Sequence, residues 1–157
     1  MKRSLKVRIL ALTITLLLGA LPVVAAERPF ALHGTGGAAF ITDVAGNIIG
    51  AKITYSGTAT HLGLWSGFGK LQFKPDPNNS NQLLATGTSI LTAANGDKLQ
   101  FLVDGTLDIT TGLGKGTLQF VGGTGRFDEA SGSANFIVTQ NLATGAFEVT
   151  AVGAINF

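Results

Sequence analysis

Apolar and small polar residues alternate with period two along most of the chain beyond the first 26 residues. In the stretch 48–61, Ile53 and Tyr55 fall on one face, whereas Lys52 and Thr54 fall on the other. Turn-forming residues interrupt the alternation at short intervals, and no stretch shows a long helical period. The pattern therefore predicts an all-β protein.

Eight strands are predicted, joined by short connections. Asn95-Gly96 is a hairpin turn signal, and residues 76–81 predict the most evident surface loop. Eight such strands favour a closed antiparallel barrel, since closure removes unpaired edges, and a β-sandwich is the alternative. A barrel of this size is either filled or holds one small ligand. The predicted strands span residues 30–42, 48–61, 65–75, 83–92, 98–108, 115–121, 130–140 and 146–157.

The first 26 residues predict a secretory signal peptide. Four basic residues precede the apolar run 9–18, and small residues end at Ala26, just before Glu27. The apolar run is short for a membrane span, although an uncleaved anchor is the alternative. The sequence thus predicts one domain over residues 27–157, secreted or periplasmic after cleavage.

Removing the signal peptide changes the charge. It carries four of the eleven Lys and Arg residues, so seven remain against nine acidic residues, a net charge of −2. No basic stripe remains, so no nucleic-acid partner is expected. The chain has no cysteine, which excludes disulfide scaffolds, thiolate metal sites and lipoproteins. No metal or other cofactor is predicted, and the oligomeric state stays open.

The motif with the highest local glycine content is a corner that connects the sixth and seventh predicted strands. Gly122, Gly123, Thr124 and Gly125 are followed by Phe127. Glycine allows the backbone to adopt positive φ, and an aromatic residue past the bend can fill the end of a barrel. We interpret these five residues as a structural motif.

Residues 121–127, which read Val-Gly-Gly-Thr-Gly-Arg-Phe, are followed by Ala-Ser-Gly at 130–132, and together they resemble the late motif of dirigent proteins. Asp128 and Ser131 stand where those proteins often carry arginine. Together with Thr-His-Leu-Gly at 60–63, the motif also resembles small exported bacterial proteins of unassigned activity. Because dirigent proteins and allene oxide cyclases share an eight-stranded antiparallel barrel with an internal cavity, the resemblance implies that fold.

Six residues are candidates for ligand binding. Tyr55 and Trp65 are the only large amphipathic aromatic residues, His61 ends a predicted strand, and Phe127 lies just past the glycine-rich corner. Asp104 could act as a general acid or base inside a barrel, although a position facing solvent is the alternative. Arg126 lies beside consecutive glycines, whose amides can bind an anion. The candidates are Tyr55, His61, Trp65, Asp104, Arg126 and Phe127.

Three functions are compatible with the sequence. The first is an exported barrel that binds a small apolar molecule or has a structural role, without assignable activity. The second is a dirigent-like or cyclase-like isomerase that steers a reactive intermediate with Asp104, His61 or Arg126. The third is an outer-membrane barrel, which the scarcity of Tyr and Trp and the polar strand faces disfavour. Stable membrane insertion is therefore not expected.

Overall fold

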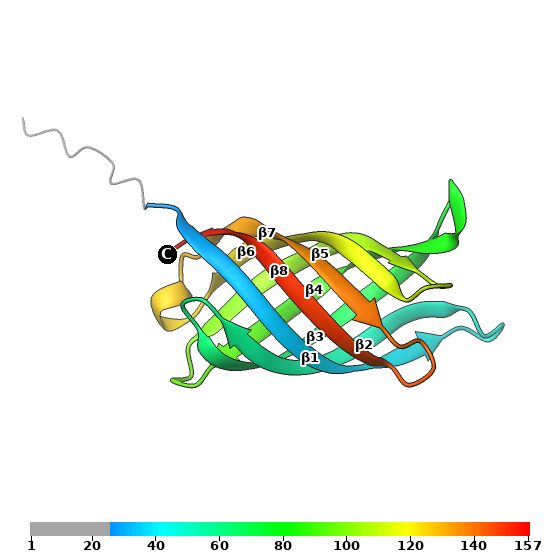
Figure 1. The fold of residues 1–157 in the computed structure, drawn as a ribbon, viewed down its shortest axis with the longest axis horizontal. Helices are drawn as coiled ribbons and strands as arrows, with labels where there is room; N and C mark the ends of the chain where they lie inside the picture. Colours follow the sequence, from blue (N-terminus) through cyan, green and yellow to red (C-terminus); the bar gives the residue numbers. More distant parts are fainter. Residues whose placement is uncertain (1–25) are drawn as a thin grey trace, which may run out of the picture.

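The computed structural model describes residues 26–157, which form a closed antiparallel barrel (Figure 1). Each strand pairs with its neighbour in the chain, and β1 pairs with β8. The predicted barrel is confirmed, and the sandwich alternative is wrong because one continuous sheet closes on itself. The strands are β1 (Arg28–Thr42), β2 (Ile48–Ala59), β3 (Gly63–Asp76), β4 (Asn79–Ala93), β5 (Lys98–Asp108), β6 (Leu113–Gly123), β7 (Ser131–Gln140) and β8 (Ala146–Asn156).

The predicted signal peptide, residues 1–26, falls outside the described residues except for its last residue. A single turn of 3-10 helix, η1 (Gly125–Phe127), lies between β6 and β7. Within the described part of the chain, no helix is long and apolar enough to cross a membrane.

The loop predicted at residues 76–81 is wrong in extent. β3 continues to Asp76 and β4 begins at Asn79, so only two residues turn the chain. Asp76 accepts a hydrogen bond from the Asn78 amide (2.8 Å), and Asn79 accepts one from the Asn81 amide (3.0 Å). Strand pairing needs only backbone groups, so this polar sequence forms the exposed tip of a long hairpin.

Alternate side chains of each strand point into the barrel, as the period-two pattern predicts. On β2, Ala51 and Tyr55 are buried, whereas Lys52 and Thr54 face solvent. Inward glycines make room for large neighbours: a Cβ on Gly34 would lie 2.6 Å from the Trp65 ring, and a Cβ on Gly67 would lie 3.2 Å from the Tyr55 ring. The missing side chains thus admit two aromatic rings to the interior.

Aromatic side chains close one end of the barrel, which we call the η1 end. It lies beside η1 and the C-terminus in Figure 1. Phe127 is fully buried, and its ring lies 5.0 Å from that of Phe157. Gly122 and Gly125 have φ angles of 99° and 62°, so the backbone bends tightly enough to aim Phe127 inward. The opposite end, which we call the four-turn end, carries the turns that follow β1, β3, β5 and β7.

The turn after β5 gives a pH-dependent contribution to stability. Hydrogen bonds from the Thr110 hydroxyl and from the Thr111 and Thr110 amides lower the pKa of the Asp108 carboxyl to about 2. Because the folded-state pKa is depressed, this contribution is present above the unfolded-state pKa near 4 and is lost as the pH falls through about 2. We expect Asp108→Asn to lower the Tm at pH 6, and the difference from the parent chain to shrink towards pH 2. Thermal unfolding followed by circular dichroism checks this; a difference independent of pH would contradict it.

Candidate functional site

A cavity of about 90 Å³ lies inside the barrel and receives side chains from all eight strands. Only Tyr55, Thr106 and Gln140 among its lining residues are polar. The cavity is smaller than the roughly 300 to 1,000 Å³ of a typical drug-sized site, so it suits a small molecule. The apolar lining residues are Leu32, Ile53, Leu71, Phe73, Ala85, Phe101, Val103, Leu107, Leu118, Phe136, Val138, Phe147 and Val149.

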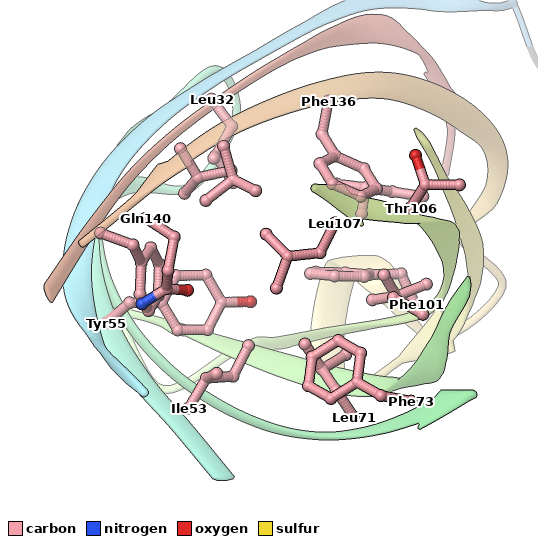
Figure 2. Close-up of a pocket in the computed structure, with 16 residues that line it drawn as sticks. Leu32, Ile53, Tyr55, Leu71, Phe73, Phe101, Thr106, Leu107, Phe136 and Gln140 are labelled. Carbon is pink, nitrogen blue, oxygen red and sulfur yellow. The ribbon is translucent and has the colours of Figure 1, made fainter. Parts of the chain in front are cut away.

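Tyr55 contributes a hydroxyl group to this apolar interior. Figure 2 shows the side chain projecting from β2 with its oxygen towards the middle of the cavity. The ring packs edge-on against Trp65, with 5.0 Å between centroids, and the hydroxyl lies 2.6 Å from Ser89 Oγ. Burial raises the pKa of Tyr55 above its ordinary range, while the hydrogen bond to Ser89 opposes the shift. Tyr55 is therefore a neutral phenol at physiological pH.

Gln140 lines the cavity at the end of β7, near the four-turn end. Its Nε2 donates to Gly145 O (2.6 Å) and Ala146 O (3.4 Å) in the following turn. These two carbonyls use the amide nitrogen, so the remaining polar atom, Oε1, is a hydrogen-bond acceptor.

Three sequence candidates lie at the η1 end and not in the cavity. His61 occupies the turn between β2 and β3 with a φ of 67°, and its Nε2 lies 3.0 Å from Pro29 O. The Arg126 side chain is partly exposed and pairs with Asp97, with 3.3 Å between Nε and Oδ2. Phe127 is the buried aromatic residue described above.

The remaining two candidates also lie outside the cavity lining. Asp104 is exposed on the outer face of β5. Trp65 is buried against Tyr55, and its Nε1 has no hydrogen-bond partner within residues 26–157. The structure therefore brings Tyr55 and Trp65 together, and of the six candidates it places only Tyr55 on the cavity wall.

Sequence reasoning missed Ser89 and Gln140. Ser89 holds an inward position of β4 between Ala85 and Leu91 and is only 2% exposed. A polar residue at an inward position of an otherwise apolar strand face was the available signal, because a buried hydroxyl needs a partner. The sequence could not indicate that this partner is Tyr55, which lies 34 residues earlier in the chain.

No family model matches the chain, and no curated protein matches it. Among solved structures, the chain is similar to a pterocarpan synthase dirigent protein at 17% sequence identity. The similarity covers 83% of this chain and 86% of that chain, with a TM-score of 0.48.

Proposed function

We propose that the chain is an exported barrel protein that binds one small apolar molecule in its interior cavity. The observation that carries this proposal is the cavity itself: apolar side chains surround it, and a few polar groups provide orientation. Sites of this composition obtain affinity from apolar burial and selectivity from the polar atoms.

Binding is a better proposal than acid–base catalysis. Among the described residues that line the cavity, Tyr55 is the only ionisable one, and its raised pKa keeps it protonated. His61, Asp104 and Arg126, which an isomerase of this kind would use, lie elsewhere on the barrel. Steering of a reactive intermediate would therefore depend on cavity shape alone.

Filling the cavity is expected to abolish binding. Ala85 lines the cavity from β4, and Ala85→Leu would place three additional carbon atoms inside it. Incubating the purified mature protein with an extract of its native cells and analysing co-purified small molecules by mass spectrometry should identify a compound that this variant fails to retain.

Ala39→Leu provides the matched control, because Ala39 is exposed on the outer face of β1. It should retain the compound as well as the parent chain does. A compound that both variants retain equally would place its binding site outside the cavity, and recovery of no compound would favour a structural role.

Export is the second part of the proposal, and it is supported by the basic start, the apolar run and the small residues that precede Glu27. The outer face also carries charged residues within the strands, including Lys52, Lys70 and Lys115, which suits a barrel surrounded by water. We expect the mature chain to begin at Glu27 and to be extracted without detergent. N-terminal sequencing after cell fractionation checks both; an intact N-terminus in the cytoplasm would contradict export.

A further inference from the structure

The hydrogen bonds around Ser89 determine which atoms of Tyr55 remain available to a ligand. Ser89 Oγ donates to Phe68 O at 2.9 Å, and a serine hydroxyl has only one proton to give. In its 2.6 Å contact with Tyr55, Ser89 must therefore accept. The Tyr55 proton points at Ser89, and the oxygen lone pair of Tyr55 is left for the cavity.

The surroundings hold this arrangement in place. Ser89 is buried, and Gly69 on the adjacent strand leaves its hydroxyl just enough room, since a Cβ at residue 69 would lie 2.9 Å from Ser89 Oγ. The Tyr55 ring is fixed by the edge-on contact with Trp65. In Figure 2 the Tyr55 oxygen faces the apolar side chains that line the cavity. Gln140 Oε1 is a second acceptor in the lining, and the hydroxyl of Thr106, which also lines the cavity, can donate or accept.

We propose that Ser89 is a specificity-determining residue that makes the cavity select small apolar alcohols over ketones of the same shape. An alcohol donates its proton to Tyr55 Oη, whereas a ketone oxygen would face the Tyr55 lone pair. A charged amine also carries donors, but no carboxylate among the described lining residues would compensate its charge. This inference rests on the proposed function, and Ser89 acts by positioning the Tyr55 proton rather than by touching the ligand.

Three probes of similar size, small enough for a cavity of about 90 Å³, test the inference: propan-2-ol, acetone and 2-methylpropane. Dissociation constants for the mature protein would be obtained by NMR titration. We expect propan-2-ol to bind roughly tenfold more tightly than acetone, equivalent to about 1.4 kcal/mol. In Ser89→Ala, the Tyr55 hydroxyl is free either to donate to the ketone or to accept from the alcohol. The affinities for the alcohol and the ketone should therefore come within about threefold of each other.

Tyr55→Phe is the second variant, and it keeps the inference testable if Ser89→Ala does not fold. It removes the Tyr55 oxygen that accepts the alcohol proton, so the preference for propan-2-ol over acetone should shrink as it does in Ser89→Ala. Equal binding of all three probes to the parent chain would overturn the selectivity and leave the proposed function intact. An alcohol preference that Ser89→Ala preserves would overturn the role of Ser89. Failure of all three probes to bind would overturn apolar ligand binding itself, and the selectivity with it.

Discussion

Phe127→Ala is expected to lower the free energy of unfolding by about 3 to 5 kcal/mol, the range for truncating a buried phenylalanine. Phe127 is fully buried and its ring contacts Phe157 at 5.0 Å. The backbone that presents it is held by Thr124 N–H donating to Lys98 O at 2.9 Å, so the corner cannot easily collapse into the space that is left. Urea denaturation of the mature chain measures the loss.

Phe68→Ala is the matched control, because it is the same substitution on the outer face of β3. The Phe68 side chain is 55% exposed, and we expect a loss below about 1 kcal/mol. Equal losses for the two variants would show that Phe127 does not close the η1 end in solution.

Gly123→Ala is expected to destabilise the barrel by about 3 kcal/mol, the upper end of the range for overpacking. A Cβ at residue 123 would lie 1.9 Å from Lys98 O and 3.1 Å from Phe127 Cβ. Because the first of these atoms belongs to the backbone, β5 and β6 would have to separate. Thermal unfolding followed by circular dichroism should show a lower Tm.

Gly37→Ala makes the opposite prediction and serves as its control. Gly37 lies in β1 at a φ that other residues adopt, and a Cβ there would meet nothing within 4 Å. Restricting the unfolded chain should stabilise the protein by about 0.4 to 1 kcal/mol. A fall in Tm for both variants would show that the contact with Lys98 does not decide the effect.

Much of the barrel follows from local sequence. The alternation on β2 separates two faces, of which the structure buries the one that carries Tyr55, and the Asn95-Gly96 turn supplies a glycine with a φ of 90°. The hairpin at Pro77 and Asn78 was misjudged because polar residues are equally compatible with a loop and with an exposed pair of strands. Because strands pair through backbone groups, the polarity of the side chains does not show where an exposed pair of strands ends.

The candidate site was less predictable than the fold. Tyr55 could be selected by residue type, but its function in the cavity depends on Ser89 from another strand. His61 and Arg126 stood beside conspicuous motifs, yet those motifs lie at the η1 end, and the cavity is formed by residues without any motif. Contacts across a barrel depend on register and shear, which no single strand encodes.

The pairing of β1 with β8 has a consequence for biosynthesis. Arg28 pairs with Ile155 and Gly37 with Ala146, so the seam joins segments more than 100 residues apart. A nascent chain that lacks the last of these strands is a curved sheet with two unpaired borders, and sealing it requires the most distant contacts of the molecule. We expect the barrel to remain open until β8 leaves the ribosome. This delay in folding would favour passage of the unfolded chain through a translocation pore.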